Sequence, residues 1–151
     1  MDYKLLIILT FIITGIWDII LRFMTLNYEK LPTYFQMDFV ENLIPYFKHH
    51  TLLSAALIAG FIGATTQIII LSIMSFPENI FNISYIIKFL ILTFIISALY
   101  GFMMKGSKLF PYLEKYYYDK LGVARSMYTD GVSGLIVQTT LLIIIYFVIT
   151  K

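Results

Sequence analysis

The sequence predicts an all-α integral membrane protein, with four transmembrane helices in a bundle and short amphipathic interfacial helices in the first and third connections. Three observations predict this class. Of the 151 residues, 60% are hydrophobic and only 13% are charged, whereas soluble domains carry about 25% charged residues. The mean hydropathy is +0.84. Four apolar stretches are each long enough to cross a bilayer as a helix, which takes about 20 residues.

The predicted spans belong to a single membrane domain, residues 1–151, and cover about residues 5–24, 51–74, 85–104 and 131–150. The first contains Asp18 and Arg22, and the third carries Lys88 near its start. The first stretch also resembles a signal peptide in length. However, Asp2 disrupts the basic segment that should come first, and no small-residue cleavage pair follows before Asp18. We therefore expect a retained helix.

Two connections carry apolar side chains at helical spacing. In residues 34–48 these side chains are Phe35, Phe39, Val40, Leu43 and Phe47. In residues 109–121, Pro111 suits the start of a helix, and Gly122 suits its end. Tyrosines are concentrated in and around these two connections, and tyrosine favours the headgroup zone of a membrane. We interpret both segments as interfacial helices in the plane of the inner leaflet. The alternative is a docking surface for a cytoplasmic protein partner.

The distribution of lysine and arginine predicts the orientation. With four spans, the two termini and the second connection share one side of the membrane. That side carries three of the basic residues, and the opposite side carries the other eight. The positive-inside rule therefore places the first and third connections in the cytoplasm and both termini on the outer or luminal side.

Small residues mark the surfaces through which membrane helices pack, because lipid supplies no hydrophobic drive between helices. The second span carries two such rows at helical spacing, which are Ala55-Ala59-Gly63 and Ala56-Gly60-Ala64. Gly101 in the third span and Gly134 in the fourth belong to similar ridges. The rows predict a close backbone contact, either within the bundle or between copies of the chain in a homo-oligomer.

Five polar residues share one level, in the inner third of the membrane, when the spans are set side by side. They are Asp18, Ser97, Tyr100, Gln138 and Thr139. A carboxylate inside a bilayer is costly unless it is neutral or paired, so it usually faces the bundle interior or water. One interpretation is a proton- or cation-handling site around Asp18, reached from the cytoplasm. The other is a structural ion pair with Arg22, one helical turn away.

Asp130 precedes Gly131 at the predicted start of the fourth span, where we expect it to cap the helix. The alternative is that this glycine-rich helix start binds an anion such as a lipid phosphate. No catalytic constellation accompanies it. Cysteine is absent, and the adjacent histidines His49 and His50 point to different sides of a helix, which disfavours a shared metal ion. We therefore expect no enzyme activity, no metal site and no cofactor.

Two functional hypotheses remain. The first is a non-enzymatic structural or assembly component that acts through helix packing and a cytoplasmic aromatic-basic surface. Its expected partners are the lipid bilayer, further copies of the chain and a cytoplasmic protein. The alternative is a small transporter or channel subunit that handles protons or cations at the polar layer around Asp18. So few charges exclude a soluble enzyme and a disordered chain, and a net charge of +2 disfavours nucleic acid as a partner.

Overall fold

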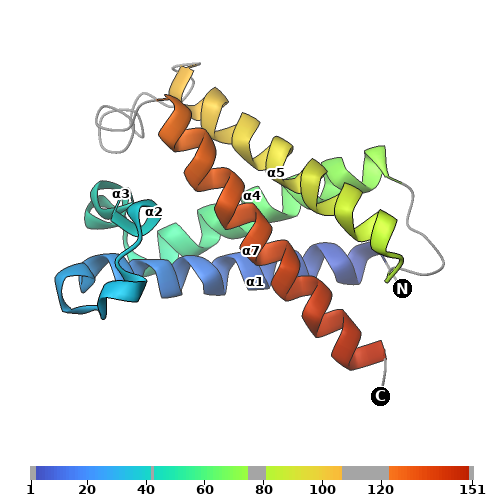
Figure 1. The fold of residues 1–151 in the computed structure, drawn as a ribbon, viewed down its shortest axis with the longest axis horizontal. Coiled ribbons are helices and arrows are strands. Elements are labelled where there is room, and N and C mark those ends of the chain that lie inside the picture. Colours follow the sequence, from blue (N-terminus) through green and yellow to red (C-terminus); the bar gives the residue numbers. More distant parts are fainter. Residues whose placement is uncertain (1–2, 42, 75–80, 107–122, 150–151) are drawn as a thin grey trace.

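The computed structural model describes residues 3–41, 43–74, 81–106 and 123–149. Within these ranges every regular element is helical (Figure 1). The four long helices are α1 (Tyr3–Leu26), α4 (Leu52–Ile73), α5 (Ile83–Gly106) and α7 (Val123–Ile149). Each contains a stretch long and apolar enough to cross a membrane. These are the helices of an integral, multi-pass membrane protein.

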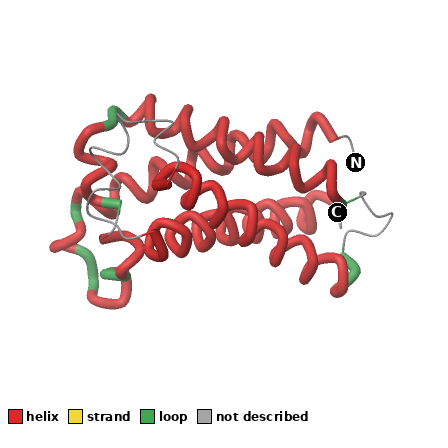
Figure 2. The backbone as a smooth tube through the Cα atoms, turned by 90° about the horizontal axis from the view of Figure 1, so that it is seen from above, coloured by secondary structure: helices red, strands yellow, loops and turns green. Residues whose placement is uncertain are grey.

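The long helices alternate in direction. The start of α1 and the end of α7 lie at one end of the molecule, and the connection from α1 to α4 lies at the other (Figures 1 and 2). The helices α1, α4 and α5 overlap the first three predicted spans. The helix α7 overlaps the fourth but begins at Val123, well before residue 131. Residues 123–130 contain neither proline nor glycine, so nothing in them ends a helix.

The four helices form two pairs. α1 packs along α4, which we call the first pair, and α5 packs along α7, which we call the second pair. The contacts between the pairs are less extensive, and α1 meets α7 where the two cross (Figure 1). We refer to each pair, α1 with α4 and α5 with α7, as a hairpin.

In the first pair, two glycines of α4 let α1 approach closely. A Cβ atom on Gly60 would lie 2.9 Å from the ring of Phe11. One on Gly63 would overlap the side chain of Thr14. The small residues of α4 thus serve contact with α1 inside the chain. Close backbone approach of this kind strengthens dispersion contacts between membrane helices.

In the second pair, α7 supplies the glycines and α5 the larger side chains. A Cβ atom on Gly131 would lie 2.6 Å from the ring of Phe94. One on Gly134 would overlap the side chain of Ser97. Both pairs therefore place a phenylalanine and a hydroxyl residue, three positions apart, on two glycines that are also three positions apart.

The two pairs also match in sequence. Residues 7–14 read IILTFIIT, and residues 90–97 read LILTFIIS. Thr10 and Thr93 hold the same place in these stretches. Each is fully buried, and its hydroxyl donates to the carbonyl oxygen four residues earlier at 2.8 Å. On the partner helices, residues 60–67 and 131–138 share the spacing Gly-x-x-Gly-x-x-x-Gln. The chain therefore contains two equivalent two-helix units that run in the same direction.

The first connection is not the single helix expected over residues 34–48. It forms η1 (Tyr28–Lys30), η2 (Thr33–Phe35), α2 (Asp38–Glu41) and α3 (Ile44–His49). Pro45 lies in the first turn of α3, where it lacks only a hydrogen bond that a helix start does not make. Val40, Leu43 and Phe47 are buried in a cluster with Leu21 of α1. Its apolar side chains thus cover one end of the bundle. The other expected interfacial segment, residues 109–121, lies outside the described residues.

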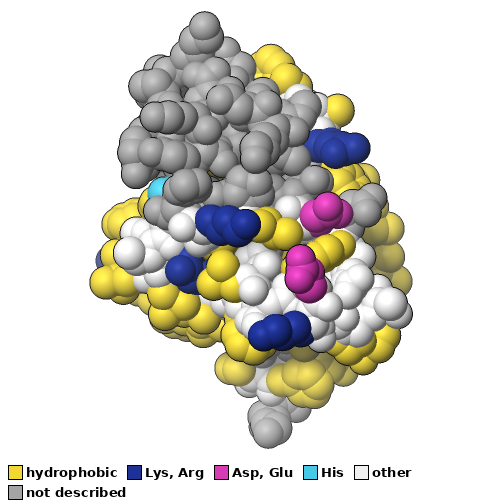
Figure 3. Space-filling model, turned by 90° about the vertical axis from the view of Figure 1, so that its left-hand side faces the viewer, with side chains coloured by type: hydrophobic (Ala, Val, Ile, Leu, Met, Phe, Trp, Pro, Cys, Tyr) yellow, Lys and Arg dark blue, Asp and Glu magenta, His cyan; other side chains and the backbone are white. Residues whose placement is uncertain are grey.

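The surface separates into apolar and charged regions. Large apolar side chains along the long helices are exposed, among them Ile8, Ile12 and Ile16 of α1, as expected for a surface that meets lipid. Charged side chains of both signs gather at the end that carries the first connection (Figure 3). The exposed charged residues of this connection are Glu29, Lys30, Glu41 and Lys48.

Candidate functional site

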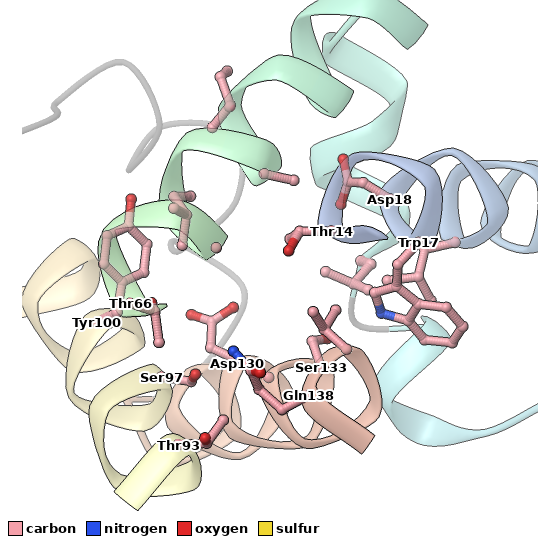
Figure 4. Close-up of a pocket in the computed structure, with 18 residues that line it drawn as sticks. Thr14, Trp17, Asp18, Thr66, Thr93, Ser97, Tyr100, Asp130, Ser133 and Gln138 are labelled. Atoms are coloured by element: carbon pink, nitrogen blue, oxygen red, sulfur yellow. The ribbon is translucent and has the colours of Figure 1, made fainter. Parts of the chain in front are cut away.

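A cavity of about 130 Å³ lies between the two pairs, with walls from all four long helices (Figure 4). Leu43 of the first connection also lines it. Half of the lining residues are polar, and two of them, Asp18 and Asp130, are acidic. No lysine, arginine or histidine is among the described residues that line the cavity.

Asp130 does not cap a helix, which corrects the expectation from the sequence. Because α7 begins at Val123, Asp130 lies about 10 Å inside the helix by helical rise. Its carboxylate points from α7 into the open centre of the cavity (Figure 4). Gly101 of α5 leaves the room for it, since a Cβ atom there would lie 2.5 Å from Asp130 Oδ2.

Asp18 is the acid of the first pair. It lies on the helix that carries the phenylalanine, whereas Asp130 lies on the helix that carries the two glycines. Counted from Phe11 and Phe94, Asp18 of α1 is equivalent to Gly101 of α5. Counted from the first glycine of each row, Ala59 of α4 is equivalent to Asp130 of α7. Each pair therefore contributes one carboxylate and one small residue at these two positions, with the helices exchanged.

Arg22 does not pair with Asp18 among the described residues. Its guanidinium group donates to the backbone carbonyl oxygens of Phe47, at 2.7 Å, and of His50. These carbonyls lie at the end of α3, where a positive charge is favourable. Arg22 remains within electrostatic range of Asp18. Even so, Asp18 Oδ2 is buried and accepts no hydrogen bond from any described residue.

Three acceptor oxygens of the lining residues, and the indole Nε1 of Trp17, are buried without a hydrogen-bond partner among the described residues. Asp18 Oδ2, Asp130 Oδ2 and Gln138 Oε1 are buried, and no described residue donates to them. The hydroxyl of Thr14 donates to the carbonyl oxygen of Thr10 at 2.6 Å. That of Thr93 is likewise bound within its own helix. Both hydroxyls therefore offer only lone pairs to the cavity.

A glutamine pair bridges the two hairpins beside the cavity. Gln138 Nε2 of α7 donates to Gln67 Oε1 of α4 at 2.7 Å. The two side chains are 2% and 0% exposed, respectively. They are equivalent positions of the two units, because each follows its second glycine by four residues. A hydrogen bond between membrane helices removes the cost of two polar groups that lipid cannot satisfy.

The structure brings together four of the residues predicted for the polar layer, which are Asp18, Ser97, Tyr100 and Gln138. Two others lie elsewhere. Arg22 holds the end of α3, and Thr139 is exposed on α7. Adjacent residues project about 100° apart around a helix, and the rotation of α7 leaves Thr139 exposed while Gln138 is buried. Placing residues by depth alone does not make this distinction.

Among the lining residues that the prediction of the polar layer left out are Thr14, Trp17, Thr93 and Asp130. The internal repeat is the sequence signal that identifies two of them, Thr14 and Trp17. Trp17 and Tyr100 occupy equivalent positions of the two units, as do Thr14 and Ser97. To place Asp130 in the cavity, one must also know that α7 begins several residues before it. Gly131 instead suggested that the helix starts at Asp130.

The predicted packing residues can be placed as well. Gly60 and Gly63 contact α1, Gly101 makes room for Asp130 and Gly134 contacts Ser97. Ala56 lies opposite Gly15, where an added Cβ atom would be 3.2 Å from the Ala56 carbonyl oxygen. Ala64 is half-buried.

Within the described residues, four long helices of a multi-pass membrane protein surround a mainly apolar cavity that carries two carboxylates and lies between the two pairs. Comparison of the chain with protein-family models, with curated proteins and with solved structures finds no match.

Proposed function

We propose that this protein is a small transporter or channel subunit that binds protons or cations within the membrane and moves them across it. The observation that carries the proposal is the pair of carboxylates, one from each hairpin, in a cavity where none of the described lining residues is basic. A carboxylate within a bilayer is costly, and a purely structural one is usually paired. Arg22, the nearest basic candidate in sequence, binds backbone carbonyls instead.

The internal repeat supports the same proposal. Many transporters consist of repeated helical units with the binding site at the interface between them, near the middle of the bilayer. Here Asp18 lies about 12 Å from the end of α1 and Asp130 about 10 Å from the start of α7 by helical rise. Both measurements start from the same end of the bundle, so the carboxylates share a depth between the two units.

The helices α2 and α3 of the first connection are the proposed gate on the cytoplasmic side. Leu43 forms part of the cavity wall, and Phe47 is buried beside it. The excess of basic residues on this side supports a cytoplasmic location. Movement of α2 and α3 away from α1 would open the cavity toward that compartment.

A flux assay tests the proposal. The full chain is reconstituted into liposomes that hold a pH-sensitive dye, and an outward potassium gradient with valinomycin drives proton entry. For other cations, vesicles loaded with sodium or tetraethylammonium are diluted into a buffer without that cation, valinomycin is replaced by a protonophore, and the dye reports the protons that enter to balance cation efflux. We expect wild-type vesicles to move at least one of these ions. Asp18→Asn and Asp130→Asn should each reduce the flux at least about tenfold, because each removes a charge that attracts the cation.

Glu29→Gln is the matched control, since it removes an exposed carboxylate of η1 that lies outside the cavity and outside α2 and α3. It should leave the flux unchanged. Circular dichroism and size-exclusion chromatography establish that each variant folds. Flux no greater than in protein-free vesicles, or equal flux in wild type and both cavity variants, would contradict the proposal.

A structural or assembly role is the second candidate, and an exposed aromatic cluster favours it. The rings of Tyr34 and Phe35 lie 4.5 Å apart between centroids, and the side chains are 72% and 41% exposed. Lys30 and Lys48 are exposed in the same connection. A role of this kind predicts that Tyr34→Ala with Phe35→Ala weakens binding to anionic vesicles or changes the oligomeric state measured by light scattering, while Asp130→Asn changes neither.

A further inference from the structure

The cavity walls have two different chemical characters. The unsatisfied acceptor oxygens come from Asp18, Asp130 and Gln138, and Gln138 is only 2% exposed. Other parts of the wall are aliphatic and are formed by Leu21, Ile58, Ile62 and Val137. A ligand that suits both parts has a group rich in hydrogen-bond donors and an apolar body.

The volume of the cavity indicates the size of that ligand. A buried water needs roughly 10–15 Å³, and an apolar cavity of about 150 Å³ holds benzene. At about 130 Å³, this cavity is much larger than a single water or a bare ion requires. In addition, no group of three histidine, aspartate or glutamate residues in the described part of the chain could hold a metal ion. The space therefore suits a small organic molecule.

The chemistry of the wall indicates the charge of the ligand. An ammonium group carries only donors, and its hydrogen bonds to carboxylates are strengthened by charge. It would supply the donors that Asp18 Oδ2, Asp130 Oδ2 and Gln138 Oε1 lack. Aromatic rings attract cations to their faces, and each hairpin places one ring at the cavity, Trp17 from the first pair and Tyr100 from the second.

We propose that the ligand of this cavity is a small organic ammonium ion with a compact apolar body. Its charged end binds Asp130 and Asp18, and its body packs against Ile58, Ile62 and Val137. This inference rests on the proposed function to the extent that both place a cation between the two hairpins. It names the class of that cation.

Trp17 provides a direct readout. It is the single tryptophan of the chain, it lines the cavity, and its indole Nε1 has no hydrogen-bond partner among the described residues. The full chain in detergent micelles is titrated with cyclopentylammonium at neutral pH while tryptophan fluorescence is recorded. Cyclopentanol, a neutral molecule of the same shape, is titrated in parallel. We expect a saturable change with the ammonium ion and at least about tenfold weaker binding of the alcohol.

Variants test the residues named. Asp130→Asn and Asp18→Asn should each weaken cyclopentylammonium binding about tenfold or more, because each loses a charge-assisted hydrogen bond. Glu29→Gln, which changes an exposed residue of η1, should bind like the wild type. Circular dichroism shows whether each cavity variant folds. If one does not, the affinities of the wild type for cyclopentylammonium and cyclopentanol still test the proposal. Equal affinity for the two probes, a response that does not saturate, or unchanged affinity in both folded cavity variants overturns the proposal.

The outcomes also separate this inference from the proposed function. Saturable ammonium binding without any ion flux in liposomes would overturn the transport role and support the ligand class. Flux of protons or inorganic cations that depends on Asp130, without ammonium binding, would overturn the ligand class and support the transport role.

Discussion

The two hairpins pack alike but place their acids on different helices. In both, a phenylalanine and a hydroxyl residue of one helix rest on two glycines of the other. The acid of the first pair, Asp18, is on the helix that carries the phenylalanine. The acid of the second pair, Asp130, is on the helix that carries the glycines.

This difference separates the requirements of packing from those of the site. Close helix contact needs residues without bulk at fixed spacing, and both units keep them. The cavity needs one carboxylate from each side at a common depth, which either helix of a hairpin can supply. In each pair, the helix without the acid carries a small residue where the other pair has its acid. Ala59 is equivalent to Asp130, and Gly101 is equivalent to Asp18. The following variants test this comparison.

The largest effect is expected from Gly63→Leu and Gly134→Leu. Each new side chain would occupy space filled by Thr14 or Ser97, so each should lower the free energy of unfolding by about 3 kcal/mol. Thermal unfolding in detergent, followed by circular dichroism, measures the loss. Thr139→Leu, on the exposed face of α7, is the control. A large loss in one hairpin and none in the other would show that the two units are not equivalent in packing.

Gly101→Ala should have the next largest effect. The added Cβ atom would lie 2.5 Å from Asp130 Oδ2 and 2.7 Å from the Ser126 carbonyl oxygen. We expect a loss of about 2 kcal/mol in the same unfolding experiment, because the acid or the helix must shift. Ala59→Gly, at the position equivalent to Asp130, should cost less. Equal losses of stability in Gly101→Ala and Ala59→Gly would contradict the idea that the two pairs carry the acid and the small residue on opposite helices.

Arg22→Gln tests the hydrogen bonds from an arginine of α1 to the end of α3. Within the described residues, only the first pair shows such a contact. The change removes the charged donor to the carbonyl oxygens of Phe47 and His50. A loss of about 1.5 kcal/mol is expected. Hydrogen exchange should increase in residues 44–50 and remain unchanged in α5. Uniform exchange throughout the chain would instead indicate a global defect.

The smallest effect is expected at the bridge between the hairpins. Gln67→Leu and Gln138→Leu each leave the other glutamine without its partner. The double variant should be more stable than the sum of the two single losses predicts. A double-mutant cycle should give a coupling of about 0.6 kcal/mol, the average for hydrogen bonds between membrane helices. Zero coupling would mean that the bridge contributes nothing to the contact between hairpins.

Part of the site follows from the sequence because depth in a membrane can be counted along a helix. Asp18, Ser97, Tyr100 and Gln138 share a level by residue count, and all four line the cavity. Thr139 shares that level and faces outward, because depth does not determine rotation about the helix axis. Asp130 was missed for a different reason. Gly131 and Gly134 suggested a helix start, whereas they serve the contact with α5 inside a longer helix.

By itself the sequence determined the class of protein, the presence of four long apolar helices in the described residues and the small residues that let helices approach. These properties depend on hydropathy and local spacing, which the chain carries in one dimension. Only the tertiary structure decided that Arg22 leaves Asp18 for the end of α3, and that Asp130 enters the cavity opposite Gly101. Both depend on contacts between segments far apart in the chain. The rotation and crossing of packed helices determine such contacts, and hydropathy does not encode them.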